Sequence, residues 1–335
     1  MVIVCDCGTT NTKLYGVEHA VCVSEKYIGA GIKDIAVHGG MRRLKHRIKE
    51  GIEQLCREAG VETDKIERVV SYGMITSEIG FIDLPHSTVP TGLAELRNTV
   101  MTVTDPDLIG NDVPVTYIRG VQNRIDIDAD LCDALQAYDF MRGEETQAMG
   151  VLALGLAKGP CNIVVLSSHS KLISINDKNQ IAGSFTTMSG QYYQVIKENT
   201  TIGKSLISDG KEALWDPDDI IRCAQNCIQK CGFTRSTMIP RFMDTVGGFH
   251  AKDRDLFMQA VIVCEDMKIF DLAEQNGLKA HRDCVIIGQK ERCELFAKAM
   301  RNKLGGDFKI SIVASLEQIR DIGVAGAVAI CGCQT

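Results

Sequence analysis

The sequence predicts an α/β protein that contains two copies of one structural plan. Each copy begins with three short apolar strands joined by tight turns and continues with alternating helical and strand patterns. The first copy begins at residue 2 and the second at residue 161. A chain of 335 residues, of which 45% are hydrophobic, has apolar material for about two domain cores. We therefore expect two domains, 1–158 and 159–335.

In the first copy the apolar runs are short and are separated by turn-forming residues, which indicates strands. One longer stretch differs, because Leu44, Ile48 and Ile52 recur at helical spacing and Gly60 follows as a helix-ending residue. The expected strands are 2–6, 11–17, 21–28, 67–73, 99–104 and 113–118, and the expected helices are 40–59 and 143–157.

The second copy repeats the three-strand beginning, and the polar residues 177–180 indicate a turn between two of its strands. Longer helical patterns follow, with short apolar runs between them. The expected strands are 161–167, 170–176, 180–187, 284–288 and 309–313, and the expected helices are 218–231, 253–275, 290–304 and 316–331.

The charge and hydropathy of the chain exclude several classes of partner. Its net charge is −6, its isoelectric point is about 5.7, and it has no basic tract, which argues against binding to nucleic acid or to an anionic membrane. No apolar run is long enough to span a membrane, and Asp6 interrupts the only apolar run at the N-terminus. We expect a cytoplasmic protein that acts on a small molecule, and the sequence is compatible with a homo-oligomer.

The chain has fourteen cysteines but no CxxC pair. Disulfides are uncommon in the cytoplasm, so most of these residues are expected to be small buried apolar side chains. Cys223, Cys227 and Cys231 would share one helix face and form the alternative, a contribution to a metal or iron–sulfur site.

Residues 6–13, DCGTTNTK, place small polar residues in the turn between the first two expected strands. The backbone of such a turn can approach phosphate oxygens closely, and Thr9, Thr10, Asn11 and Lys13 can donate hydrogen bonds to them. Asp6 would repel phosphate but can hold a hydrated Mg²⁺ that neutralises it. The alternative interpretation is an ordinary polar hairpin turn.

The second copy carries a comparable turn at residues 167–170, SSHS, followed by Lys171. Two such turns facing each other across a cleft could hold one triphosphate from both sides. The hydrogen-bonding residues would be Ser168, His169, Ser170 and Lys171. A histidine at such a position is otherwise a structural or surface residue.

A third polar stretch, RGEE, begins at Arg142 and precedes an expected helix near the domain boundary. Glu144 or Glu145 could accept a proton from a substrate hydroxyl as that hydroxyl attacks a γ-phosphate. Arg142 could bind a substrate carboxylate through its planar guanidinium group. The alternatives are that the two glutamates only stabilise the helix N-terminus and that Arg142 forms an ion pair.

Taken together, these motifs resemble the 2-dehydro-3-deoxygalactonokinase family of the actin-like ATPase superfamily. The resemblance covers most of the chain. It rests on strings that include DCGTTNTKLYGV, GMITSEIGF at 73–81, MRGEETQAMG at 141–150, SSHSKL at 167–172 and VIIGQKERCELF at 285–296. It implies two RNase H-like domains, each a mixed five-stranded sheet with helices, and an ATP cleft between them. It also implies ATP and Mg²⁺ as cofactors.

The resemblance further implies a kinase that phosphorylates the terminal hydroxyl of a 2-keto-3-deoxy sugar acid, 2-dehydro-3-deoxy-D-galactonate, in galactonate degradation. Glu144 would be the catalytic base with Glu145 in reserve, because a carboxylate follows a glycine at this helix start in related sugar kinases. The resemblance places the sugar-acid pocket at Gly73, Met74, Ser77 and Arg142, and the adenosine side at Gly288.

Among the departures from the family pattern, two bear on the function. Ser167 stands where the family usually has a glycine, and Gln191 stands where it usually has an acid. These departures motivate a second hypothesis, a catalytically weak or inactive protein that binds a nucleotide or a sugar acid. A third hypothesis is an ATPase activator of a redox enzyme, which would use clustered cysteines to hold an iron–sulfur cluster.

Overall fold

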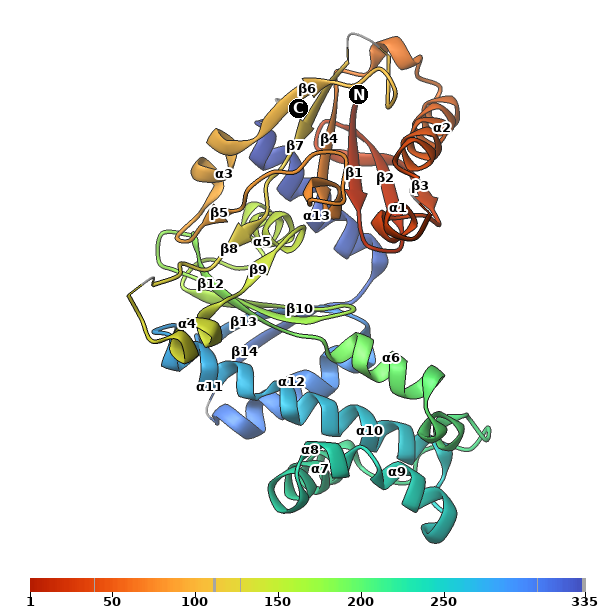
Figure 1. Cartoon of the computed structure of the whole chain (residues 1–335), viewed down its shortest axis with the longest axis vertical. Helices are drawn as coiled ribbons and strands as arrows, with labels where there is room; N and C mark the ends of the chain where they lie inside the picture. Colours follow the sequence, from red (N-terminus) through yellow and green to blue (C-terminus); the bar gives the residue numbers. More distant parts are fainter. Residues whose placement is uncertain (39, 111–112, 127, 306, 333–335) are drawn as a thin grey trace. The chain divides into compact units, whose positions relative to one another are not determined.

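A computed structural model describes the chain except residues 39, 111–112, 127, 306 and 333–335 (Figure 1). Two compact units can be distinguished by their internal contacts. Unit 1 comprises Met1–Pro160, Ile173–Ser184 and Leu316–Thr335, and unit 2 comprises Cys161–Leu172 and Phe185–Ser315. The single domain boundary at 158/159 stays a prediction.

Unit 1 contains a six-stranded mixed sheet with the order β3-β2-β1-β4-β7-β6. The inner strands β1 and β4 run parallel and are buried along almost their whole length, whereas β3 at the edge alternates exposed and half-buried residues. The strands are β1 (Val2–Cys7), β2 (Thr12–Glu18), β3 (Val21–Ile28), β4 (Arg68–Gly73), β6 (Met101–Thr104) and β7 (Pro114–Tyr117).

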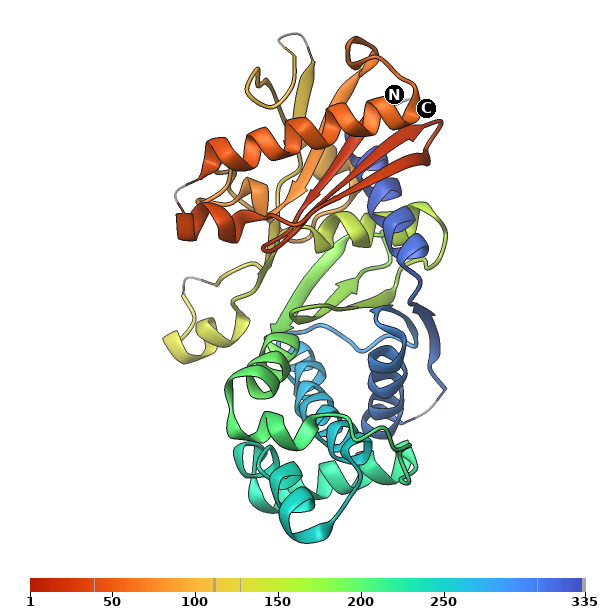
Figure 2. The ribbon, with the colours of Figure 1, turned by 90° about the vertical axis from the view of Figure 1, so that its right-hand side faces the viewer.

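The helices of unit 1 cover both faces of this sheet (Figure 2). Helix α2 packs on β2 and β3 through buried residues that include Leu44, Ile48 and Ile52, and Gly60 ends it in a left-handed conformation. Helices α5 and α13 lie on the opposite face and pack tightly against each other. The helices are α1 (Ile32–His38), α2 (Met41–Ala59), α3 (Leu93–Thr99), α4 (Leu131–Ala137), α5 (Glu144–Ala153) and α13 (Leu316–Cys331).

A small three-stranded sheet, β5-β8-β9, also belongs to unit 1. Its strands are β5 (Ser87–Thr88), β8 (Val121–Gln122) and β9 (Phe140–Met141). The last of these strands leads directly into Arg142, Gly143 and the start of α5. The small sheet therefore fixes the position of the RGEE stretch at the start of α5.

The other large sheet has five strands in the order β12-β11-β10-β13-β14, with β10, β13 and β14 parallel. Its strands are β10 (Cys161–Leu166), β11 (Ser170–Ile175), β12 (Ile181–Thr187), β13 (Asp283–Gly288) and β14 (Lys309–Val313). The helices of unit 2 are α6 (Ser189–Asn199), α7 (Pro217–Cys231), α8 (Phe233–Ser236), α9 (Ile239–Phe242), α10 (Ala251–Asp266), α11 (Lys268–Gln275) and α12 (Lys290–Leu304).

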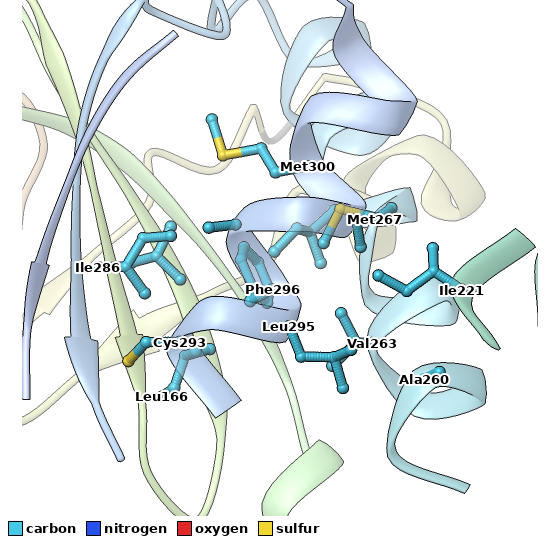
Figure 3. Packing of buried hydrophobic residues seen from close by; sticks show 14 of the residues in the cluster. Leu166, Ile221, Ala260, Val263, Met267, Ile286, Cys293, Leu295, Phe296 and Met300 are labelled. Carbon is cyan, nitrogen blue, oxygen red and sulfur yellow. The ribbon is translucent and has the colours of Figure 1, made fainter. Parts of the chain in front are cut away.

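The core of unit 2 forms where α12 packs between the sheet and helix α10 (Figure 3). Phe296 of α12 is completely buried, as is Ile286 of β13. Figure 3 shows Leu295 of α12 beside Val263 of α10. This core fixes the carboxyl ends of β10 and β13 relative to α10 and α12.

The α/β class predicted from the sequence, with mixed sheets and helices, is confirmed. The first sheet has one strand more than the predicted five, because β6 pairs antiparallel with β7 at its edge. The predicted helix 253–275 is two helices, α10 and α11, which meet at Met267. Helices α1, α3, α4, α6, α8 and α9 were not predicted.

None of the helices in the described part of the chain combines the length and the apolar character that a membrane crossing requires.

Candidate active site

Backbone hydrogen bonds fix the conformation of the turn between β1 and β2. The Gly8 N–H donates to the Asn11 carbonyl at 2.9 Å, and the Lys33 N–H at the start of α1 donates to the Thr9 carbonyl at 2.8 Å. Thr9 and Thr10 are exposed and Asn11 is half-buried. The turn is therefore fixed at its base while its polar side chains remain accessible, as a phosphate-binding turn requires.

Asp6 lies near the end of β1 in a row of paired residues across three strands. Its partner on β2 is Lys13, and its partner on β4 is Tyr72. Side chains of paired residues lie on the same face of a sheet. Burial raises the pKa of Asp6 to about 6. The Lys13 ammonium and the neighbouring Tyr72 hydroxyl act to lower this pKa, and Glu144 acts to raise it.

Two glycines bring Glu144 close to Asp6. Gly73 ends β4 with a φ of 88°, and a Cβ at this position would lie 2.6 Å from the Cys7 carbonyl oxygen. A Cβ on Gly143 would lie 3.6 Å from the Cα of Gly73. The start of α5 thus approaches the ends of β1 and β4, and this approach explains the electrostatic effect of Glu144 on Asp6.

The two adjacent glutamates differ in their surroundings. Glu145 is 0% exposed, and its Oε atoms accept hydrogen bonds from the Gly143 N–H at 2.7 Å and from the Thr146 hydroxyl at 3.0 Å. Burial, with a smaller contribution from Glu144, raises the pKa of Glu145 to about 8. Glu144 is half-buried. Of the two carboxyl groups, Glu144 is the one that a substrate can reach.

The glycine-rich loop after β4 is tied to Arg142. The guanidinium group donates to the Thr76 hydroxyl at 3.0 Å and to the Leu84 carbonyl at 2.8 Å. Burial lowers the pKa of Arg142, and Glu145 partly counteracts this effect. Ser77 is 2% exposed and its hydroxyl donates to the Met74 carbonyl, while Met74 itself is half-buried. The structure thus brings the predicted sugar-acid residues together, and their ligand contacts stay predictions.

The second turn lies in unit 2, between β10 and β11. It is closed by a hydrogen bond from the Ser167 N–H to the His169 carbonyl at 2.8 Å, and the Ser168 hydroxyl lies 3.1 Å from His169 Nδ1. Ser167 does not have a positive φ. The serine that replaces the expected glycine therefore fits this turn without backbone strain. Ser168 is exposed, whereas Ser170 is completely buried.

Two charged residues that the sequence did not single out have hydrogen bonds at this turn or at the end of the nearby strand β12. Arg292 of α12 donates to the Ser167 carbonyl and, at 2.8 Å, to the Ser170 hydroxyl. Asp266 at the end of α10 accepts hydrogen bonds from Thr187, at 2.6 Å, and from Ser189. Burial raises the pKa of Asp266, and these hydroxyls and Arg292 oppose the rise. Arg292 lies within the string 285–296, but no local pattern marked Asp266.

Lys171 has a different environment from the exposed part of the turn. Its side chain is 4% exposed, and its ammonium group donates to the Thr186 hydroxyl at 2.5 Å. The structure thus shows a buried contact within unit 2. Binding of phosphate by Lys171 stays a prediction.

A pocket of about 790 Å³ lies next to the second turn, entirely within unit 2. This volume falls in the range of small-molecule sites. Gly288 adjoins it, because a Cβ there would lie 2.6 Å from the carbonyl oxygen of the lining residue Leu166. The lining residues are Leu166, Ser167, Ser168, Gly190, Tyr193, Gln194, Lys197, Glu198, Asp255, Gln259, Ile262, Val263, Gln289, Glu291 and Arg292.

Within the described ranges, no group of three or more histidine, cysteine, aspartate or glutamate side chains could hold a metal ion. On α7, Cys223 and Cys227 are half-buried and Cys231 is exposed. The iron–sulfur alternative therefore gains no support from this face. Asp6 and Glu144 fit a different kind of site, since Mg²⁺ binds through one or two carboxylates together with waters and substrate phosphates.

Comparisons with known proteins show the family and the fold of the chain. A family model described as 2-keto-3-deoxy-galactonokinase matches residues 6–315. No curated protein matches the chain. A solved structure from Sinorhizobium meliloti, provisionally named a 2-dehydro-3-deoxygalactonokinase, is similar with a TM-score of 0.73 and 18% identity, and the similarity covers 98% of this chain and 99% of that one.

A second solved structure, component A of the (R)-2-hydroxyglutaryl-CoA dehydratase from Acidaminococcus fermentans, is similar with a TM-score of 0.50 and 11% identity. This similarity covers 98% of this chain and 96% of that one. At such identities both structures show a shared fold and nothing about activity.

Proposed function

Because this chain belongs to the 2-keto-3-deoxy-galactonokinase family, a family of phosphotransferases, we propose that it uses ATP to phosphorylate the terminal hydroxyl of a 2-keto-3-deoxy sugar acid. We further propose 2-dehydro-3-deoxy-D-galactonate as the substrate. The observation that carries the proposal is the close approach of Gly143, which directly precedes the half-buried Glu144 at the start of α5, to Gly73 at the end of β4, next to the end of β1 where Asp6 lies.

Glu144 is the general base in this proposal. It accepts the proton of the terminal hydroxyl while the hydroxyl oxygen forms a bond to the γ-phosphorus, and the bond from that phosphorus to the ADP oxygen breaks. The products are ADP and the phosphorylated sugar acid. Glu145 is the less suitable base, because its carboxyl group is buried and both of its oxygens already accept hydrogen bonds.

Asp6 is the proposed Mg²⁺ ligand. When bound, Mg²⁺ neutralises phosphate charge and so favours attack by the hydroxyl oxygen. Asp6 fits this role because it offers a carboxylate at the end of a strand, beside the exposed residues of the first turn. Lys13, on the neighbouring strand, adds a positive charge for the phosphates.

The remaining contacts follow from the two turns. Thr9, Thr10 and Asn11 of the first turn and Ser168, His169 and Ser170 of the second are proposed to bind phosphate oxygens, with Lys171 contributing charge. The adenosine group is proposed to occupy the pocket next to Gly288, whose polar and apolar lining suits a nucleoside. Gly73, Met74, Ser77 and Arg142 are proposed to surround the sugar acid.

The proposal is tested by measuring ADP release with ATP and Mg²⁺. The acceptors are 2-dehydro-3-deoxy-D-galactonate and its gluconate epimer, which differ only in stereochemistry. Glu144→Gln removes the base and is expected to lower kcat by about 10²-fold or more. Glu145→Gln is the matched control, because it changes the neighbouring carboxyl group in the same way and is expected to keep most of the turnover.

Turnover that is lost in Glu144→Gln and kept in Glu145→Gln would support the proposed base. The acceptor with the higher kcat/KM would identify the substrate. Binding of ATP without phosphate transfer to either acid would contradict the kinase proposal. Equal loss in both variants would contradict the separate roles given to the two glutamates.

A further inference from the structure

Asp266 is a buried carboxylate of unit 2 that the proposed reaction does not use. It is the last residue of α10 and is 3% exposed. Its Oδ1 atom accepts hydrogen bonds from the Thr187 hydroxyl, at 2.6 Å, and from the Ser189 hydroxyl. Thr187 ends β12 and Ser189 begins α6. One carboxylate therefore joins the end of α10 to the place where the chain passes from the sheet into α6.

The start of α6 contacts the second turn directly. The Gln191 N–H donates a hydrogen bond to the Ser168 carbonyl at 2.8 Å. A Cβ on Gly190 would collide with the Ser167 carbonyl oxygen, so the helix comes this close to the turn only with a glycine here. Asp266 is thus connected to the turn through two hydroxyl groups and the first three residues of α6.

Three carbonyl groups of the turn accept hydrogen bonds from the protein. The Ser167 carbonyl accepts one from Arg292 of α12. The Ser168 carbonyl accepts the bond from Gln191 at the start of α6. The His169 carbonyl accepts one from the Ser167 N–H at 2.8 Å. Carbonyl oxygens carry partial negative charge and repel a phosphate, whereas N–H groups attract it. A phosphate-binding turn therefore needs its carbonyl oxygens held by other donors, and the start of α6 supplies one of these donors.

We propose that Asp266 is a positioning residue for the second turn. Its hydrogen bonds to Thr187 and Ser189 hold the start of α6 against the turn, and this contact keeps the turn in the conformation that binds nucleotide phosphate. The inference rests on the proposed function, which places phosphate at this turn. Asp266 acts through α6 and does not itself contact the nucleotide.

The simpler alternative is that Asp266 only stabilises the core of unit 2. Asp253 provides the matched comparison, because it is 1% exposed, lies on the same helix and also accepts two hydrogen bonds through its Oδ1 atom. Its donors are the N–H groups of Leu214 and Trp215, at 2.8 and 3.0 Å, and neither residue belongs to α6 or to the turn. Replacing either aspartate by alanine removes a buried carboxylate from α10. Only Asp266→Ala releases the start of α6.

The test measures ADP binding by calorimetry, without sugar acid, and amide hydrogen exchange by NMR without any ligand. Asp266→Ala is expected to weaken ADP binding about tenfold, the effect of losing hydrogen bonds to a charged group, and to speed the exchange of the Gln191 N–H. Asp253→Ala, with its folding checked by circular dichroism, is expected to match the wild type in both measurements.

Asp266→Asn separates the hydrogen bonds of this side chain from its charge. An amide oxygen can accept both hydrogen bonds, and Oδ2 of Asp266 has no hydrogen-bond partner in the part of the chain that the structure describes. The asparagine variant is therefore expected to keep most of the ADP affinity. If Asp266→Ala does not fold, Ser189→Ala takes its place, because it removes one of the two donors with little change in volume, and it is expected to weaken ADP binding about threefold.

Wild-type ADP affinity in Asp266→Ala, or in Ser189→Ala where that variant replaces it, would overturn the inference. Equal weakening in Asp266→Ala and Asp253→Ala would do the same, and so would equal weakening in Asp266→Ala and Asp266→Asn, because the charge and not the hydrogen bonds would then matter. Neither measurement needs a sugar acid. A lack of phosphate transfer would therefore contradict only the proposed kinase activity, whereas a wild type that does not bind ADP would overturn both proposals.

Discussion

Replacing Glu145 by glutamine is expected to change how the stability of the protein depends on pH. The carboxyl group of Glu145 is completely buried and its pKa is raised from 4.5 to about 8. The folded protein therefore binds a proton here that the unfolded chain releases above pH 4.5. Since the folded state binds more protons between these two values, the free energy of unfolding falls as the pH rises through this window.

The magnitude follows from the two pKa values. A tenfold change in proton affinity corresponds to about 1.4 kcal/mol, so the rise to about 8 limits the effect to about 5 kcal/mol. Relaxation of the buried site reduces this limit, and we expect about 2 kcal/mol. Glutamine resembles the protonated side chain in shape and cannot ionise, so Glu145→Gln avoids the loss. The stabilising contribution of the proton on Glu145 is complete below pH 4.5 and absent above pH 8.

The measurement is urea unfolding of the wild type and of Glu145→Gln at pH 5, 6, 7 and 8, with EDTA present. The variant should gain about 2 kcal/mol of stability relative to the wild type between pH 5 and pH 8. Asp6, whose pKa is raised to about 6, titrates in both proteins and largely cancels in the comparison. Parallel stability curves across this range would refute the argument that a buried, protonated Glu145 lies beneath the start of α5.

Three further predictions concern the support of the site and the cores. Arg292→Ala removes the hydrogen bonds to Ser167 and Ser170 and is expected to weaken ADP binding about tenfold by calorimetry; binding as in the wild type would contradict this. Gly326→Ala would place a Cβ 1.9 Å from the Thr146 carbonyl oxygen and should lower the free energy of unfolding in urea by about 3 kcal/mol. An unchanged urea midpoint would contradict this prediction, because it would show that α5 and α13 can move apart at little cost in free energy. Phe296→Ala should cost about 4 kcal/mol by the same assay, because its ring is completely buried in the unit 2 core (Figure 3); a cost below about 1 kcal/mol would contradict the packing.

Much of the fold could be predicted from the sequence, because the longer elements carry regular patterns. Helix 40–59 shows a helical repeat of apolar residues with Gly60 at its end, and the structure has α2 over Met41–Ala59. Helices α1, α3 and α4 have seven residues each, which is too few turns for a repeat to be recognised. The break at Met267 falls inside an apolar pattern that continues across it, so periodicity alone did not reveal it.

The candidate site divides in the same way. Two parts of the site are contiguous in the sequence: Asp6 with the turn that follows it, and Gly143 with Glu144. The sequence by itself therefore determined that the first lies at the end of a strand and the second at the start of a helix. The choice between Glu144 and Glu145 depends on burial, which packing decides. The pairing of Tyr72 with Asp6 across β4 and β1, the close approach of Tyr72 to Gly323, and the hydrogen bond of Thr187 to Asp266 join residues far apart in the chain. Only the tertiary structure decided them, because hydrogen bonds and close packing depend on distances in space that no local pattern of residues encodes.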